Sequence, residues 1–141
     1  MPDVPHDLDG ILGFHIRLAH GAVYRHFNET SGAAGLTQKQ TSVLWLVSDD
    51  PGISQTDIAR RLHIDRATTM AITNTLTMRD YLERRSSSTD RRRQALHLTP
   101  AGQAALTIAR AAVAAHEAWL VARFKPAEVT QLIALLRRIH D

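Results

Sequence analysis

The order of hydrophobic and polar residues predicts a chain of helices that is interrupted once by a short hairpin. From Leu8 to about Phe27, apolar residues recur every three or four positions, which is the spacing of one helix face. The segment 28–35 that follows is rich in Gly, Ser, Asn and Thr, a composition typical of loops. We therefore expect an amphipathic N-terminal helix that ends before residue 28.

Polar residues in capping positions predict where the next three helices begin. Thr37, with Gln40 three residues later, fits a capping box, in which each side chain binds the backbone N–H of the other residue. Ser54 and Asp65 stand at the same place before the two helices that follow. The third helix should end at Leu62, so that only two residues separate it from Asp65. A join this short is typical of a helix-turn-helix.

Beyond the fourth helix, which should end near Arg79 or Asp80, the pattern changes to that of short strands. The segments 81–86 and 93–98 are the predicted strands, and the polar residues 87–91 join them into a hairpin. The sequence therefore predicts a two-stranded wing directly after the helix-turn-helix.

Two further helices are expected after the hairpin. Thr99 followed by Pro100 is a strong helix start, with the threonine as cap and the proline at the first helical position. This helix should run to about Phe124. Pro126 opens a last helix whose apolar residues are too many for a lone surface helix to cover.

The predicted fold class is mainly α, and 141 residues suffice for one domain with helical extensions. The winged helix-turn-helix is expected at 36–99. An N-terminal arm at 1–35 and the C-terminal helices at 100–141 are expected to form a dimerisation region.

Charge points to a polyanionic partner, although the totals alone argue this only weakly. Seventeen Lys and Arg stand against fourteen acids, a formal net charge of +3. The clustering is the stronger indication, because six arginines fall between Arg79 and Arg93, against three acids. A polar helix followed by a basic hairpin suits duplex DNA, with side chains for the base edges and cations for the phosphates.

Several other classes of protein are disfavoured. The absence of cysteine excludes a disulfide framework and a thiolate zinc site. There is no nucleophile elbow, phosphate-binding glycine loop or carboxylate pair, so neither an enzyme nor a cofactor is expected. The first residues lack a signal-peptide pattern, and no apolar run approaches the roughly 20 residues of a membrane helix. We expect a cytoplasmic protein that does not enter a membrane.

The segment 90–102 carries a recognisable motif. Asp90, Arg92, Leu98 and Thr99 follow the order Asp, any residue, Arg, five residues, Leu-Thr, and a helix begins near a glycine shortly afterwards. This pattern resembles the wing signature of the MarR family of bacterial transcriptional regulators, and the resemblance extends over essentially the whole chain. One departure is Asp80, which stands where the family usually has glycine.

The resemblance implies a function. Members of that family are homodimers whose N- and C-terminal helices intertwine, and they bind palindromic operators in double-stranded DNA. Many are repressors that a small aromatic or acidic ligand releases from DNA. The alternative is a structural, nucleoid-type DNA-binding protein with little sequence preference and no effector.

Candidate DNA contacts lie on the third and fourth helices. The base-reading candidates on the fourth helix share side chains that suit guanine or the thymine methyl group: Arg66, Thr68, Thr69 and Thr73. The residues at the start of the third helix can offer hydroxyl or amide groups to phosphate: Ser54, Gln55 and Thr56. Plain helix capping by Ser54 remains an alternative that does not exclude this.

In the wing, the candidates are Arg85, Asp90, Arg91 and Arg92. In the family signature the arginine corresponding to Arg92 reaches the minor groove, and the aspartate orients an arginine of the wing. A narrow, strongly negative minor groove attracts a guanidinium group. The alternative is that these arginines form a solvated basic loop.

The sequence also suggests an effector site. His15, Trp45 and His116 lie on faces expected to border a ligand pocket, and Arg17 could neutralise an anionic effector such as an aromatic carboxylate or its thioester. The alternative is that the two histidines are hydrogen-bonded core residues. No metal is expected, because the arm histidines are spaced by five and six residues rather than by three or four.

Overall fold

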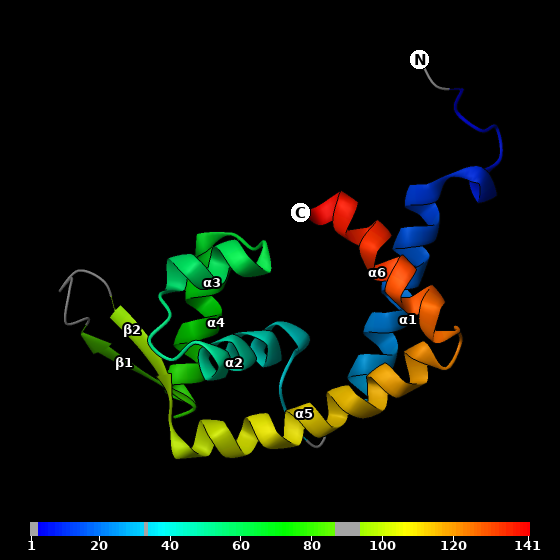
Figure 1. The fold of residues 1–141 in the computed structure, drawn as a ribbon. Helices are drawn as coiled ribbons and strands as arrows, with labels where there is room; N and C mark the ends of the chain where they lie inside the picture. The colour runs from blue at the N-terminus through cyan, green and yellow to red at the C-terminus, as the bar shows by residue number, and fades with distance from the viewer. Residues whose placement is uncertain (1–2, 33, 87–93) are drawn as a thin grey trace. The chain divides into compact units, whose positions relative to one another are not determined.

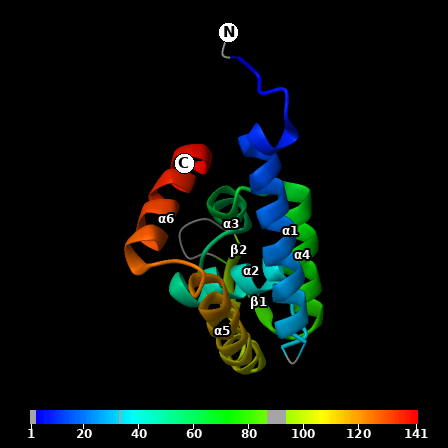
Figure 2. The same cartoon turned by 90° about the vertical axis from the view of Figure 1, so that its right-hand side faces the viewer.

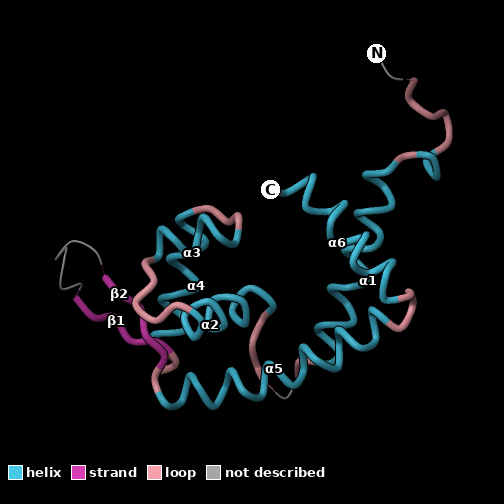
Figure 3. The backbone as a smooth tube through the Cα atoms, viewed as in Figure 1, coloured by secondary structure: helices cyan, strands magenta, loops and turns pink. Residues whose placement is uncertain are grey.

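The computed structural model describes residues 3–32, 34–86 and 94–141 of the chain. Its elements follow the predicted order of helices, hairpin and helices (Figures 1 and 3). The bounds are η1 Leu8–Gly10, α1 Leu12–Thr30, α2 Gln38–Asp49, α3 Gln55–Leu62, α4 Arg66–Met78, β1 Leu82–Ser86, β2 Gln94–Leu98, α5 Pro100–Val121 and α6 Pro126–His140.

The chain divides into two compact units, of which residues 31–112 form one, and residues 1–30 with 113–141 form the other. The first unit is larger than the DNA-binding domain predicted at 36–99. It includes the first half of α5, because Leu106 and Ala109 of that helix are buried in its core.

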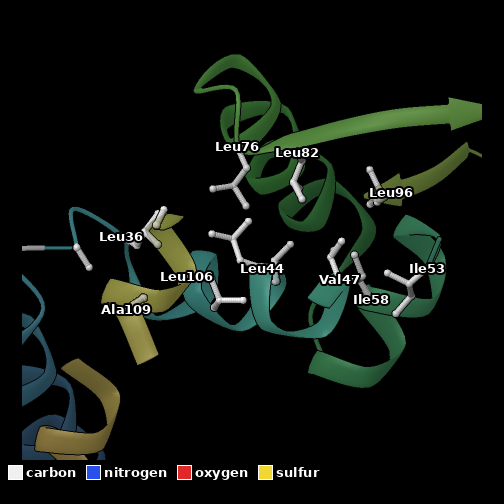
Figure 4. Packing of buried hydrophobic residues seen from close by; sticks show 13 residues of the cluster. Leu36, Leu44, Val47, Ile53, Ile58, Leu76, Leu82, Leu96, Leu106 and Ala109 are labelled. Atoms are coloured by element: carbon white, nitrogen blue, oxygen red, sulfur yellow. The ribbon is translucent and has the colours of Figure 1, made fainter. Parts of the chain in front are cut away.

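The core of unit 31–112 is built around α2. Leu44 of α2 is fully buried among side chains from α4, the wing and α5: Leu76, Leu82, Leu96 and Leu106 (Figure 4). These elements lie far apart in sequence, and burying five leucines together holds the helix-turn-helix, the wing and α5 as one body.

The predicted caps are confirmed. Thr37 and Gln40 form the full capping box at the start of α2. The Ser54 hydroxyl accepts the backbone N–H of Asp57, and the Asp65 carboxylate accepts that of Thr68. Caps are local, so the sequence alone predicts these helix starts well.

The N-terminal helix differs from its prediction at both ends. It begins at Leu12 rather than Leu8, since the preceding turn is the separate η1, and Ile11 after it has an extended backbone. It continues to Thr30 instead of ending near Phe27. The Thr30 hydroxyl donates to the carbonyl oxygens of His26 and Phe27, which satisfies the last turn despite its loop-like composition.

The wing is an antiparallel pair in which Leu82 faces Leu98 and Arg84 faces Leu96. Both strands lie within one residue of the predicted segments, and the predicted turn at 87–91 lies outside the described residues. Leu82 and Leu96 are buried, so they anchor the base of the wing to the core.

The turn from α4 into β1 explains why the family usually has glycine where this chain has Asp80. Asp80 has a φ of 63°, a left-handed conformation that glycine adopts without strain and other residues adopt at a cost. The carbonyl oxygen of Asp80 accepts a hydrogen bond of 2.5 Å from the Thr99 hydroxyl, and the same hydroxyl caps α5 by accepting the N–H of Gly102. Thr99 therefore ties the end of α4 to the start of α5.

Among the described residues one helix, α5, is long and apolar enough by length and composition to cross a membrane. The expectation that no apolar run approaches such a length is therefore wrong. Leu106 and Ala109 of α5 are buried in the protein's own core, and Arg110 and Glu117 interrupt its apolar sequence. The helix is thus packed in this core along one face, while only 22% of its most apolar stretch is buried within the single chain.

Candidate nucleic-acid interface and effector region

The helix-turn-helix consists of α3 and α4 joined by a tight turn. His63 has a φ of 54°, and its backbone N–H caps α3 on the carbonyl oxygens of Ala59 and Arg60. The N–H of Ile64 donates to Ala59 as well. Because Ile58 and Ala59 are buried, α3 is packed firmly and the direction in which α4 starts is defined.

The start of α3 exposes one of the three residues expected to contact phosphate. Thr56 is exposed. Ser54 is buried, with its hydroxyl capping the helix, which agrees with the alternative of plain capping. Gln55 is half-buried, and its Nε2 donates to the Thr73 Oγ1 at 2.8 Å. Gln55 thus connects the start of α3 to the middle of α4.

Two of the four predicted base-reading residues face the protein interior. Thr69 and Thr73 are 1% and 0% exposed. Their hydroxyls donate to the carbonyl oxygens of Asp65 and Met70, as threonine commonly does within a helix. Both residues therefore leave the set of expected base contacts, because a buried side chain cannot reach a base edge.

The other two candidates lie at the start of α4. Arg66 is exposed. Thr68 is half-buried, and its hydroxyl donates to the second carboxylate oxygen of Asp65 at 2.9 Å. Two hydrogen bonds from Thr68 lower the pKa of Asp65; the one from the backbone N–H has the larger effect and the one from the hydroxyl the smaller. The carboxylate thus stays charged as a cap, and the Thr68 hydroxyl is hydrogen-bonded to it.

The exposed face of α4 consists mostly of residues that the sequence analysis did not select. Ala67, Met70, Ala71 and Asn74 are exposed, at the helical spacing of a single face. Since Thr69, Thr73 and Leu76 form the buried face, the periodicity held the information to identify this surface. Polar residue type was the weaker guide.

The wing is connected to this face through an arginine that was also not selected. The Arg84 Nη2 donates to the Asn74 Oδ1 at 2.5 Å and to the Thr73 Oγ1 at 3.5 Å. Arg85 is exposed and pairs with Glu83 on the same strand. The predicted contacts Asp90, Arg91 and Arg92 lie outside the described residues.

The second unit, residues 1–30 with 113–141, contains a cluster of rings. His116 is 6% exposed, and its Nδ1 lies 2.7 Å from the Nδ1 of His26. His26 stacks on Trp119 with 3.8 Å between ring centroids, and Arg123 lies over Trp119 at 3.9 Å. The pKa of His116 is lowered mainly by burial and to a smaller extent by the charge of His26. The alternative of a hydrogen-bonded core histidine thus describes His116 in this unit.

The same unit contains α1 and α6 (Figure 2). Residues of these two helices line an apolar cavity of about 410 Å³. His15, His20 and Leu132 are among its lining residues. The His15 Nε2 donates to the carbonyl oxygen of Asp9 at 2.6 Å, and Arg17 is exposed, 6.0 Å from the centre of the Phe14 ring.

Trp45, the fourth predicted effector residue, belongs to unit 31–112. Its ring is half-buried, with the Arg110 guanidinium 4.9 Å from its centre. Arg110 also donates to the Ser48 hydroxyl at 3.3 Å. In the described part of the chain, no three His, Asp or Glu side chains gather in a way that could hold a metal ion.

The fold and the exposed α3–α4 surface define a winged helix-turn-helix DNA-binding protein. Residues 34–93 match the model of the MarR family. A putative transcriptional regulatory protein for the hcr operon of Thauera aromatica is 36% identical over 132 residues, 93% of this chain and 80% of the relative. The chain belongs to the MarR family of transcriptional regulators, which confirms the resemblance and the predicted fold class.

Solved structures agree over nearly the full length. The transcriptional repressor CouR bound to a 23-mer DNA duplex has a TM-score of 0.90 and 32% identity, covering 99% of both chains. CouR bound to p-coumaroyl-CoA has a TM-score of 0.87 and 31% identity, covering 97% of this chain and 96% of that one. A third structure is that of BpsR of Bordetella bronchiseptica, whose DNA binding is regulated by 6-hydroxynicotinic acid. It has a TM-score of 0.91 and 26% identity, covering 98% of this chain and 99% of that one.

The protein is therefore a DNA-binding transcriptional regulator, and like MarR proteins in general it is a homodimer. This agrees with α6, whose apolar residues are exposed in the single chain: Leu132, Ile133, Leu135, Leu136 and Ile139. Such a face needs a covering partner.

Proposed function

We propose that this protein is a cytoplasmic repressor that binds a palindromic operator and is released by an aromatic carboxylic acid or its coenzyme A thioester. One observation carries the proposal. A repressor that is 31–32% identical to this chain over nearly its full length has been solved both on a DNA duplex and with p-coumaroyl-CoA. We propose no catalytic role.

The proposed DNA surface combines the start of α3, the exposed face of α4 and the wing. Thr56 at the start of α3 and Arg66 at the start of α4 would contact phosphate, and both are exposed. Arg85 would add a charge at the wing, and Arg92 would enter the minor groove. Two such surfaces in a dimer would read two half-sites related by two-fold symmetry, hence the palindrome.

The residues proposed to contact an effector are His15, Arg17 and His116 in one unit and Trp45 in the other. Their chemistry fits an aromatic acid, because indole and imidazole rings can stack on an aromatic group and a guanidinium can pair with a carboxylate. The apolar cavity lined by His15 and the exposed position of Arg17 are compatible with this role.

The DNA-binding part of the proposal is tested by an affinity ratio. Binding to a palindrome from the DNA upstream of the protein's own gene is compared with binding to random duplex at one fixed salt concentration. A specific regulator should prefer its site by about 10³-fold or more. A ratio near one would instead support the alternative of a structural, nucleoid-type protein.

The wing is tested by Arg92→Ala. This variant should weaken binding and lower the slope of log affinity against log salt by about one, because one phosphate-neutralising charge is lost. Arg138→Ala, which removes an exposed charge near the end of α6, is the matched control and should leave the slope unchanged. Equal slopes in all three proteins would contradict the wing assignment.

The effector is tested with a panel of aromatic acids and their coenzyme A thioesters. A true effector should raise the melting temperature and, at the same concentrations, release the operator fragment. If no compound of this class does either, the effector proposal fails, whereas the assignment as a DNA-binding regulator is unaffected.

A further inference from the structure

The polar groups of α4 are largely used within the protein. The hydroxyls of Thr68, Thr69, Thr73 and Thr77 all donate to oxygen atoms of α4 or of its cap Asp65. Thr73 also accepts from Gln55. A helix that looks polar in sequence therefore offers few hydroxyl groups to DNA.

Apolar groups dominate the outward face of the same helix. Met70 is 52% exposed, and the neighbouring positions Ala67 and Ala71 are exposed on the same side. The polar residue on this face is Asn74. Its Oδ1 accepts a hydrogen bond from Arg84, so its amide N–H groups are the part that can donate to another molecule. This patch, Ala67 with Met70, Ala71 and Asn74, is called the α4 patch.

The position of the α4 patch determines what can cover it. Arg66 lies at its N-terminal end, and Arg84 of the adjacent strand contacts its Asn74, so an apolar centre is bordered by two cations. A polyanion with apolar groups at its surface fits this arrangement. Duplex DNA has such groups in the major groove, where each thymine presents a 5-methyl group beside its O4 acceptor.

We infer that the α4 patch reads thymine methyl groups, with Met70 as the main specificity-determining residue. Met70 and the two alanines exclude water from the methyl groups, and the Asn74 amide donates to an acceptor on a neighbouring base edge. Methionine suits this role because its flexible thioether chain adapts to the shape of the groove floor. The inference rests on the protein's being a sequence-specific DNA-binding regulator, and it predicts that each half-site contains thymine opposite Met70.

The test removes single methyl groups from DNA. The full-length protein first selects its preferred site from randomised duplexes, and each thymine of a half-site is then replaced by deoxyuridine, which lacks only the 5-methyl group. At the position opposite Met70, deoxyuridine should weaken binding about fourfold, the ratio that corresponds to returning one methyl group to water.

The variants make the assignment specific to one residue. In Met70→Ala the deoxyuridine effect at that position should shrink to less than about twofold, because the contact that sensed the methyl is gone. Met78→Ala is the matched control. Met78 is 87% exposed but stands at the last position of α4, whereas recognition helices contact bases near their N-terminal end. This variant should keep the full fourfold effect.

Three results would overturn the inference. Deoxyuridine could be neutral at every position in the wild type, or its effect could persist undiminished in Met70→Ala. Met70→Ala could also change the oligomeric state of the protein in the absence of DNA without changing the deoxyuridine effect. That result would identify the patch as a protein-docking surface. If no sequence is enriched in the selection, the proposed operator-binding function fails as well, so the two failures are distinguishable.

Discussion

Replacing Gly102 by alanine should damage the joint between α5 and the wing. A Cβ built on Gly102 would lie 2.0 Å from the carbonyl oxygen of Tyr81 and 2.9 Å from its carbonyl carbon. Both neighbouring atoms are backbone, so no side chain can rotate away. The Tyr81 oxygen also accepts the backbone N–H of Thr99 at 3.1 Å, and moving it would disturb that bond.

The magnitude follows from two opposing effects. Alanine is favoured over glycine in a helix by about 1 kcal/mol. Forcing an extra carbon into a packed site costs about 1–3 kcal/mol and occasionally more. An overlap with the backbone at 2.0 Å places Gly102→Ala at the upper end or beyond. We expect a net loss of about 2 kcal/mol, which corresponds to a melting temperature lower by about 4–8 °C.

Thermal unfolding followed by circular dichroism, at equal protomer concentrations, measures this effect. Gly13→Ala is the matched control, because Gly13 lies in α1 and a Cβ there would meet nothing within 4 Å. That variant should be unchanged or more stable by up to about 1 kcal/mol. If Gly102→Ala behaved like Gly13→Ala, the close approach of α5 to Tyr81 would be refuted.

Two further predictions concern the arms. Removing residues 126–141 should convert the dimer into a monomer in sedimentation experiments, because the exposed apolar face of α6 would be lost; a stable dimer after truncation would assign dimerisation to other surfaces. The pKa of His116 is lower in the folded protein than the ordinary value of 6.5 that it has in the unfolded chain. As the pH falls through 6.5, the unfolded chain therefore binds more protons than the folded protein, and the stability of the fold should decrease. In His116→Gln the decrease in melting temperature between about pH 7.5 and 5.5 should be smaller, whereas in His6→Gln, a change at an exposed position, it should equal that of the wild type.

Features set by neighbouring residues were predictable from the sequence. The capping box of Thr37 and Gln40 and the caps at Ser54 and Asp65 involve contacts over three residues, so their patterns are readable without a fold. The two strands of the wing were predicted to within one residue, because short strand patterns on both sides of a polar segment are also readable without a fold. The family signature added the functional class, which charge clustering alone left open.

Features set by distant contacts were not predictable in the same way. Thr69 and Thr73 have the residue type of base-reading side chains, but they share the helix face of Leu76, and the packing of α4 against α3 and the wing buries that face. The break at Ile11 escaped notice because hydrophobic spacing continues through it, although η1 and α1 are separate. Residue type indicated which helix is functional, but burial determines which of its faces is available.

The inward-facing threonines of α4 have a consequence for how this regulator can change during evolution. They and Leu76 form the buried face of α4, whereas Ala67, Met70 and Ala71 are exposed and belong to no buried core. Substitutions at such exposed sites typically alter stability by no more than about 0.5 kcal/mol. A gene duplicate could therefore acquire a new operator through one or two changes on this face and still fold as before. The same separation makes these three positions the natural ones to randomise when a regulator of chosen DNA specificity is to be made from this scaffold.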